Sequence, residues 1–234
     1  MQPLVYIDIS SIQGLAVLFS YVFLASAVVF AVLHYRTGQY PFSAAVTLSC
    51  LAAVCLWADL RITAAYALSV VGDWFMAHSG GKNGDKRLMG GILFFFLAHA
   101  CFLSYSIYHM AYRPQLLWLI PAGMLVLGYG IFLWKKLLPA IPDRTIRIAA
   151  AAYTGISLAV LTSSLLSRDT PLSKWLFCAG ICMIMFSDTL IALSRFLGKK
   201  GVGRFICPTY FACHILVAAS VLAFEGLFGG FVPS

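Results

Sequence analysis

The chain has 234 residues, of which 62% are hydrophobic and only 10% are charged, and its mean hydropathy is +0.92. Soluble domains carry about 25% charged residues, so this composition excludes an ordinary soluble domain and predicts an integral membrane protein. The net charge of +8 comes from basic residues in short loops between apolar runs, a placement that indicates membrane topology and argues against nucleic-acid binding.

Eight apolar runs approach or reach the roughly 17–25 residues that a membrane-spanning helix needs. The sequence therefore predicts an all-α protein, with residues 1–234 forming one integral-membrane domain built as a polytopic bundle of eight transmembrane helices. The weakest predicted boundary lies between the second and third spans, which only Asp59, Leu60 and Arg61 separate. In chain order the spans are expected at residues 12–34, 42–58, 61–78, 88–110, 115–134, 146–167, 172–195 and 205–228.

Basic residues are distributed unequally between the two sides of the predicted bundle. The loops after spans one, three, five and seven hold 12 Lys and Arg residues, whereas the opposite side holds only Arg61, Arg113, Arg168 and Lys174. By the positive-inside rule, both termini are predicted to lie on the non-cytoplasmic side of the cell membrane.

Two aspartates, Asp73 and Asp188, lie inside the third and seventh predicted spans. A charged side chain at the centre of a span costs at least about 2.5–3.5 kcal/mol, so an ionisable residue there is a candidate functional residue. Each aspartate follows a small residue, Gly72 or Ser187, and precedes an apolar stretch. Because two carboxyls shielded from water can hold different protonation states, the pair predicts acid–base chemistry.

Polar residues of the two chain halves recur at a fixed offset. Asp188 lies 115 residues after Asp73, and His214 lies 115 residues after His99. The offset predicts two four-helix halves of the same orientation, in which these four residues converge on one interior site. Chance recurrence in a chain rich in alanine and phenylalanine is the alternative.

Other polar residues share helix faces with the aspartates and histidines. Tyr66 and Ser69, for example, lie on the face of Asp73 at spacings of seven and four residues. For each such residue the alternative is a structural role, since a hydrogen bond between membrane helices contributes only about 0.6 kcal/mol on average. The candidate supporting or substrate-binding residues are Tyr66, Ser69, His99, Ser187, Tyr210 and His214, with His99 expected to orient one carboxyl.

Several short segments together resemble one family of membrane proteins. The segments are Gly72-Asp73, Gly91 through His99 with Tyr105, Phe186-Ser187-Asp188 with Leu190, Ala192 and Phe196, and Tyr210 with Ala212. Their order and spacing resemble the YhhN family, the lysoplasmalogenases, over predicted spans three to eight, leaving spans one and two as membrane anchors. Where the chain has Ala212-Cys213-His214 the family is expected to have Ala followed by Gln, so the resemblance assigns no role to His214.

The resemblance implies hydrolysis of the vinyl ether bond of a lysoplasmalogen-type lysophospholipid, which gives a fatty aldehyde and a glycerophospho-headgroup. A vinyl ether is hydrolysed by protonation of its double bond, and water then captures the resulting oxocarbenium ion. A carboxylic acid can supply the proton and a carboxylate the countercharge, as in glycosidases. We therefore expect Asp73 and Asp188 to be catalytic, with Asp188 favoured as the acid, and we expect no metal or organic cofactor.

Two other functions are compatible with the same residues. One is a proton-coupled membrane transporter, in which the aspartates and histidines relay protons. The other is a zinc-dependent membrane lipid hydrolase with Asp73, His99, Asp188 and His214 as metal ligands. The expected partners are the lipid bilayer and a membrane lipid substrate, with no nucleic acid, and the sequence assigns no oligomeric state.

Overall fold

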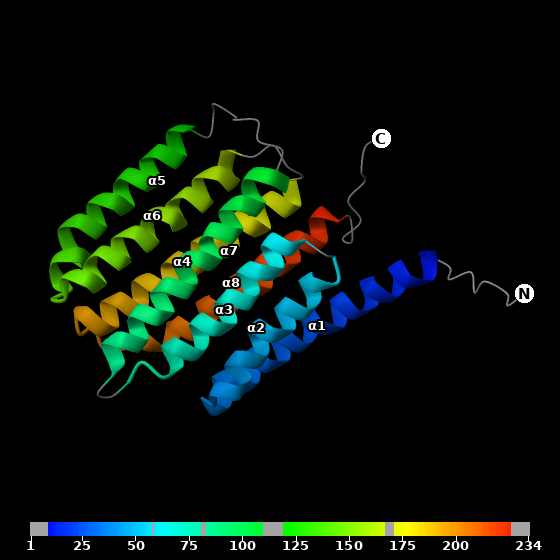
Figure 1. Cartoon of the computed structure of the whole chain (residues 1–234), viewed down its shortest axis with the longest axis horizontal. Helices are drawn as coiled ribbons and strands as arrows, with labels where there is room; N and C mark the ends of the chain where they lie inside the picture. The colour runs from blue at the N-terminus through cyan, green and yellow to red at the C-terminus, as the bar shows by residue number, and fades with distance from the viewer. Residues whose placement is uncertain (1–8, 58, 81–82, 110–118, 167–170, 226–234) are drawn as a thin grey trace, which may run out of the picture.

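The structure is a computed structural model that describes residues 9–57, 59–80, 83–109, 119–166 and 171–225. These residues form eight α-helices and no β-strand (Figure 1), which confirms the predicted all-α class. In chain order the helices are α1 (Ile9–Thr37), α2 (Tyr40–Cys55), α3 (Leu60–Ala77), α4 (Gly84–His109), α5 (Leu119–Phe132), α6 (Arg144–Leu166), α7 (Pro171–Phe196) and α8 (Gly203–Phe224).

Aspartate caps fix the starts of α3 and α6. The Asp59 carboxylate accepts hydrogen bonds from the backbone N–H groups of Arg61 and Ile62, at 2.8 and 3.1 Å, and the Asp143 carboxylate accepts one from the N–H of Ile146 at 2.8 Å. Such caps satisfy backbone donors that the first turn of a helix leaves unpaired. The short connection between α2 and α3 is therefore a real boundary between two helices.

Among the described residues, six helices are long and apolar enough to cross a membrane: α1, α4, α5 with its continuation to Ala140, α6, α7 and α8. The chain is accordingly an integral membrane protein. α2 is apolar but has only 16 residues, which span about 24 Å at 1.5 Å per residue, and the 18 residues of α3 include Arg61 and Asp73. Membrane crossing by these two helices stays a prediction.

The fifth predicted span differs most from the structure. α5 continues beyond Phe132 as a π-helical turn at Leu133–Leu137 and a 3₁₀ turn at Leu138–Ala140, so the helical run ends six residues after the predicted end. Residues 115–118 of the predicted span lie outside the described residues. The π turn places Leu133 and Leu137 in the protein interior, where both are buried.

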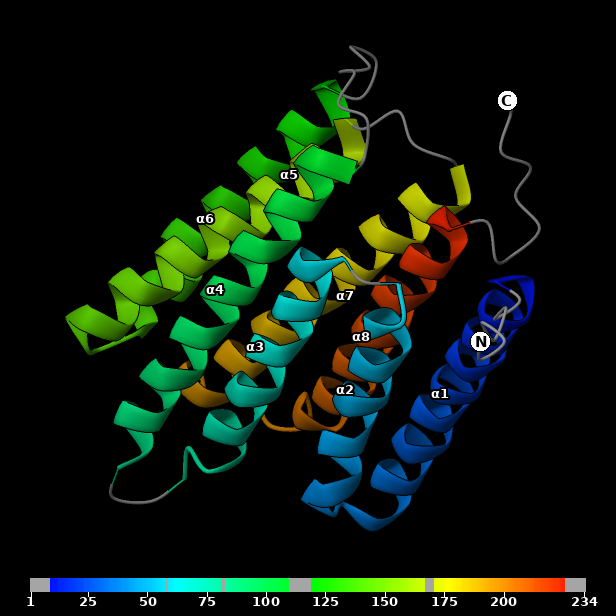
Figure 2. The same cartoon turned by 45° about the vertical axis from the view of Figure 1, so that its right-hand side comes forward.

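Six helices form a closed ring. α2 packs against α3, α3 against α4, α4 against α6, α6 against α7, α7 against α8, and α8 against α2. Helix α1 lies outside this ring against α2 and α8, and α5 lies outside it against α6. In Figure 2, α2, α3 and α4 lie in front of α7 and α8. Side chains that point into this ring come from both halves of the chain.

The neighbours in the second half of the chain repeat those in the first. If α1 to α4 are matched in order with α5 to α8, the order of helices around the ring stays the same. The match also pairs α1, which lies outside α2, with α5, which lies outside α6. Residue contacts follow the same offset: Gly72 lies against Gly91, while Ser187 and Ile206, each 115 residues later, are joined by a hydrogen bond of 3.1 Å. This is the arrangement that two related four-helix halves would produce, and it supports the predicted duplication.

Glycines allow close helix contact within each half. A Cβ on Gly90 of α4 would lie 2.6 Å from the ring of Phe75, and one on Gly180 of α7 would lie 2.6 Å from Cγ2 of Val217. Small residues let membrane helices approach one another closely. The two contacts bring α3 to α4 and α7 to α8, the four helices that carry the aspartates and histidines.

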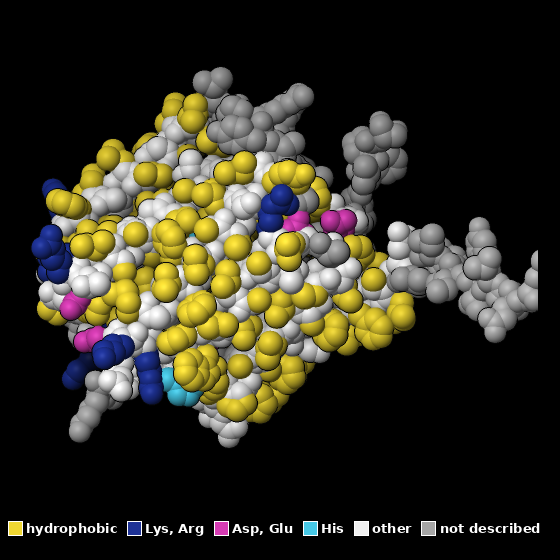
Figure 3. All heavy atoms as spheres, viewed as in Figure 1, with side chains coloured by type: hydrophobic (Ala, Val, Ile, Leu, Met, Phe, Trp, Pro, Cys, Tyr) yellow, Lys and Arg dark blue, Asp and Glu magenta, His cyan; other side chains and the backbone are white. Residues whose placement is uncertain are grey.

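Charged side chains gather at the ends of the bundle, and the face between them is apolar (Figure 3). The turns that follow α1, α3, the continuation of α5, and α7 lie at one end, together with a large group of Lys and Arg side chains. We call this the basic end. An apolar band between polar ends is what a surface in contact with lipid needs. That the basic end is cytoplasmic stays a prediction from the positive-inside rule.

Candidate functional site

Asp73 lies on the inner face of α3 and is held by two hydroxyl groups. The Thr47 hydroxyl of α2 donates to Oδ2 at 2.8 Å, and the Tyr210 hydroxyl of α8 donates to Oδ1 at 2.5 Å. The aspartate is only 8% exposed. Because each carboxyl oxygen has a donor, one from α2 and one from α8, Asp73 is fixed in orientation by two other helices of the ring.

Asp188 lies on α7 and has a different environment. The Tyr153 hydroxyl of α6 donates a short hydrogen bond to Oδ2, and Oδ1 accepts no hydrogen bond from the described residues. Asp188 is partly exposed, and it lines a cleft that opens at the surface. One carboxyl oxygen of Asp188 is therefore held by Tyr153, and the side chain forms part of the cleft wall.

The cleft lies between α3, α4, α6 and α7, with Leu137 and Ile141 near the basic end, and has a volume of about 90 Å³. Its lining is mainly apolar, and Asp188 is the one carboxyl group among the described residues that form it. Among the hydroxyls that line the cleft are those of Thr189 and Tyr129, which are bonded to each other at 2.7 Å, and that of Tyr153. The cleft therefore presents an apolar wall with one carboxyl group.

The two carboxyls belong to separate hydrogen-bonded pairs. Tyr210 is bonded to Asp73, Tyr153 is bonded to Asp188, and no hydrogen bond joins the two aspartates. The structure thus directs both predicted catalytic residues into the ring interior without placing them in direct contact.

His99 and His214 are both fully buried inside the ring. His99 Nδ1 lies 2.9 Å from the carbonyl oxygen of Phe95, in its own helix, and its Nε2 has no hydrogen-bond partner in the described part of the chain. The predicted orientation of a carboxyl by His99 is therefore not seen. Tyrosines hold both aspartates instead. Among the described residues no three His, Cys, Asp or Glu side chains come together as metal ligands would, so the zinc shell considered as an alternative is not assembled.

Three other predicted supporting residues use their hydroxyls within the scaffold. The Tyr66 hydroxyl donates to the carbonyl of His214 at 2.6 Å, Ser69 donates to Ala65 at 2.9 Å, and Ser187 donates to Ile206 at 3.1 Å. The first and third of these bonds join different helices, whereas that of Ser69 lies within α3. Of the predicted supporting residues, Tyr210 is the one that bonds to an aspartate.

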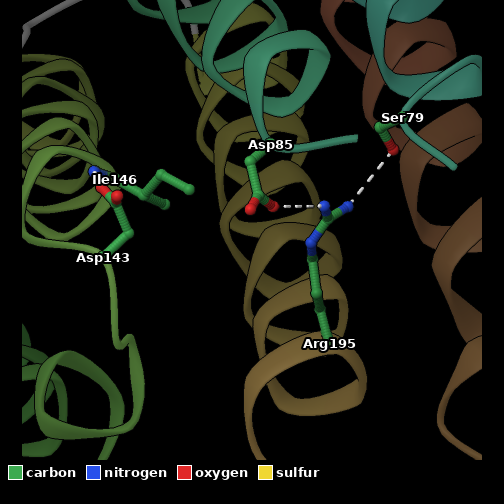
Figure 4. Close-up of polar contacts among 5 residues, drawn as sticks. All are labelled: Ser79, Asp85, Asp143, Ile146 and Arg195. Carbon is green, nitrogen blue, oxygen red and sulfur yellow. Dashed lines mark hydrogen bonds and ion pairs between the residues drawn. The ribbon is translucent and has the colours of Figure 1, made fainter. Parts of the chain in front are cut away.

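An ion pair joins helices beside the cleft at the basic end (Figure 4). Arg195, one residue before the cleft-lining Phe196, contacts Asp85 Oδ1 at 3.2 Å and Ser79 Oγ at 3.3 Å. The contacts connect the end of α7 to the turn after α3 and to the first turn of α4. Arg147 donates from Nε and Nη2 to the carbonyl oxygen of Ile141, which also lines the cleft.

Two residues that sequence reasoning missed complete the site, namely Thr47 and Tyr153. Thr47 stands in an ordinary apolar run, and Tyr153 follows four alanines. Thr47 recurs at the 115-residue offset as Thr162, whereas Tyr153 has no counterpart, since residue 38 is glycine. In each half, the helix before the aspartate carries a hydroxyl that donates to it. Thr47 precedes Asp73 by 26 residues and Tyr153 precedes Asp188 by 35, so the two donors do not share one sequence spacing.

Comparison with known proteins identifies a family. The family model described as the YhhN family matches residues 41–221, more than half of the chain. The resemblance had predicted a match that begins in the third span. The family model instead begins in α2, so it includes Thr47 and covers all six ring helices. No curated protein and no solved structure matches the chain.

Proposed function

The chain belongs to the YhhN family, and on that premise we propose that it is a membrane hydrolase that cleaves the vinyl ether bond of alkenyl lysophospholipids. The observation that carries the proposal is the position of Asp188, a carboxyl with one free oxygen on the wall of an otherwise apolar cleft. An alkenyl lysophospholipid has a single long apolar chain that ends in an acid-sensitive vinyl ether. The cleft offers a matching apolar wall and one acid.

The depth of Asp188 fits a lysophospholipid whose headgroup lies at the basic end. Asp188 precedes Phe196, the last residue of α7, by eight residues, which is about 12 Å along a helix. A glycerophospho-headgroup can bridge such a distance. We therefore place the vinyl ether beside Asp188, the alkenyl chain deeper in the membrane, and the phosphate near the basic residues.

Asp188 supplies the proton in the proposed reaction. The electron pair of the double bond takes the Asp188 proton at the alkene carbon remote from oxygen, and the positive charge is shared by the other carbon and the ether oxygen. The Asp188 carboxylate left behind stabilises this oxocarbenium ion. Water then attacks the cationic carbon and returns one proton to Asp188. The resulting hemiacetal breaks into a fatty aldehyde and a glycerophospho-alcohol, so that one water is consumed and Asp188 is regenerated.

Tyr153 and Asp73 support this chemistry from outside the reacting atoms. Tyr153 holds Oδ2 of Asp188, which leaves Oδ1 to face the substrate. Asp73, with two donors, is the better stabilised carboxylate, so we assign it a constant negative charge that acts on the site through Tyr210. The sequence-based preference for Asp188 as the acid fits this division, since Asp188 has one donor and access to the cleft.

Isotope labelling tests the proposal. Purified protein in detergent is incubated in D₂O with an alkenyl lysophospholipid, and in parallel with the saturated alkyl ether of the same length. We expect aldehyde that carries one deuterium on the carbon next to the carbonyl, and no product from the saturated ether, which has no double bond to protonate.

Other outcomes of this experiment contradict the proposal. Aldehyde without deuterium at that carbon would exclude protonation of the double bond. No product from the alkenyl lipid, together with substrate-dependent proton flux in sealed vesicles, would favour the proton-coupled transporter instead. Aldehyde release that a chelator abolishes and added zinc restores would favour the zinc-dependent hydrolase.

A further inference from the structure

The centre of the ring contains three polar atoms that have no hydrogen-bond partner among the described residues. They are Nε2 of His99 and both ring nitrogens, Nδ1 and Nε2, of His214. Both side chains have no exposed surface. Buried polar atoms in proteins nearly always have a partner, and where none is found among the protein atoms a bound water is a common explanation.

The local geometry fixes the hydrogen-bonding character of His99. Its Nδ1 lies 2.9 Å from the Phe95 carbonyl oxygen, which can only accept, so Nδ1 must carry the hydrogen. In the neutral imidazole, Nε2 is then an acceptor. His214 offers one donor and one acceptor whichever nitrogen carries its hydrogen. The unpartnered ring nitrogens of His99 and His214 are therefore two hydrogen-bond acceptors and one donor.

The two histidines contact the same pair of buried aromatic residues and the two tyrosines that hold the aspartates. Between ring centroids, His99 lies 5.8 Å from Phe102, His214 lies 5.4 Å from Tyr66, and Phe102 and Tyr66 are 6.0 Å apart. The ring of His99 lies 5.0 Å from that of Tyr153, and the ring of His214 lies 4.5 Å from that of Tyr210. Each histidine therefore contacts the tyrosine of one tyrosine–aspartate pair.

We propose that His99 and His214 bind buried water through their unpartnered nitrogens. A water donates two hydrogen bonds and accepts two, so one molecule can donate to His99 Nε2 and accept from the N–H of His214. The two histidines do not line the cleft and are completely buried, and a neutral water costs less to bury there than an ion does. The set of two imidazoles without a third ligand argues for water over a metal ion.

The bound water joins the two tyrosine–aspartate pairs into one polar row through the ring. His99 and His214 are then positioning residues, which act on the aspartates through Tyr153 and Tyr210. This second role depends on the proposed function, whereas the water site itself does not. The resemblance to the family assigns nothing to His214, so the role comes from its place in the structure.

Nuclear magnetic resonance of the imidazole nitrogens tests the water site directly. The full chain, labelled with ¹⁵N-histidine, is examined in micelles, and a variant with His34, His78 and His109 replaced by Gln leaves only the two buried histidines. We expect His99 to carry its hydrogen on Nδ1 and both rings to show cross-relaxation with bound water. The absence of water cross-relaxation, or a direct N–H···N coupling between the rings, would overturn the proposal, as would a stoichiometric metal ion.

Aldehyde release from an alkenyl lysophospholipid tests the positioning role. His214→Leu is expected to lower kcat by roughly 10-fold or more, because small misplacement of catalytic groups has effects of this size. In an Asp73→Asn background, His214→Leu should lower kcat little further, since the effects of substitutions within one network are not additive. Multiplied losses would refute the role. His78→Leu is the control for the loss of an imidazole, because His78 is exposed and its Nδ1 contacts only the Trp74 carbonyl of its own helix, at 2.7 Å, among the described residues.

The two experiments separate the water site from the proposed function. If the wild-type protein releases no aldehyde, the proposed function fails, and the resonance measurement still decides the water site. If aldehyde is released and no water is detected, the function stands and the inference about the histidines is wrong.

Discussion

Replacing Tyr153 by Phe is the most informative single substitution for the site. The change removes the hydroxyl that donates to Asp188 Oδ2 and leaves the aromatic ring, which packs 5.0 Å from His99. Asp188 then has no hydrogen-bond donor among the described residues and loses the contact that fixes its carboxyl. We expect the substitution to reduce kcat while the protein remains folded.

The size of the loss follows from the energy of one hydrogen bond. A bond of this kind contributes about 1–3 kcal/mol, with bonds to charged groups at the upper end. Since a tenfold rate change corresponds to about 1.4 kcal/mol, the loss in kcat/KM is expected to be roughly 5- to 150-fold if the bond is used in the transition state. An effect on substrate binding alone would appear in KM instead.

The assay is aldehyde release from an alkenyl lysophospholipid by the purified variants. Tyr129→Phe is the matched control, because Tyr129 lines the same cleft but bonds to Thr189, so its activity should stay within a few-fold of wild type. Thermal unfolding in detergent verifies that both variants are folded. Wild-type activity in Tyr153→Phe would refute the assignment of Asp188 as the acid held by Tyr153.

Three further predictions concern packing, the cleft and its rim. Gly180→Val should lower stability by about 1–3 kcal/mol in thermal unfolding, because the new side chain would collide with α8. Gly155→Ala is the control, because a Cβ at Gly155 would have nothing within 4 Å. Equal unfolding midpoints for the two variants would contradict the packing of α7 against α8. Ala192→Phe should fill the cleft one turn beyond the acid and abolish aldehyde release without lowering the unfolding midpoint; full activity would show that substrate does not use the cleft. Arg195→Gln should lower stability by less than about 1 kcal/mol, because the ion pair with Asp85 is largely exposed, and a larger loss would show that the pair anchors the bundle.

The helices were predictable from the sequence because apolar runs are long and separated by charged or glycine-rich turns. The predicted and observed helices differ mainly at their ends. Gly84 through Arg87, expected in a loop, form the first turn of α4, and α5 extends through a π turn. Both differences occur where charged residues continue a helix beyond the apolar core, which hydropathy alone does not detect.

The ring order and the partners of the aspartates were less accessible from the sequence. The repeat at 115 residues predicted equivalent positions for Asp73 and Asp188, and the structure agrees with equivalent helices, α3 and α7. Hydrogen-bond donors depend on which helices become neighbours, and this is decided by packing between distant segments. Tyr153 and Thr47 therefore had no local signal, and His99 was assigned a role that a tyrosine fills.

The central claim is that Asp188 is the acid of a vinyl ether hydrolase. The most direct test compares aldehyde release by wild-type protein, Asp188→Asn and Asp143→Asn, each verified as folded, on an alkenyl lysophospholipid. Asp143 caps α6 outside the cleft, so its substitution controls for the loss of a carboxyl. We predict that the wild type and Asp143→Asn release aldehyde and that Asp188→Asn does not. Undiminished release by Asp188→Asn would contradict the account.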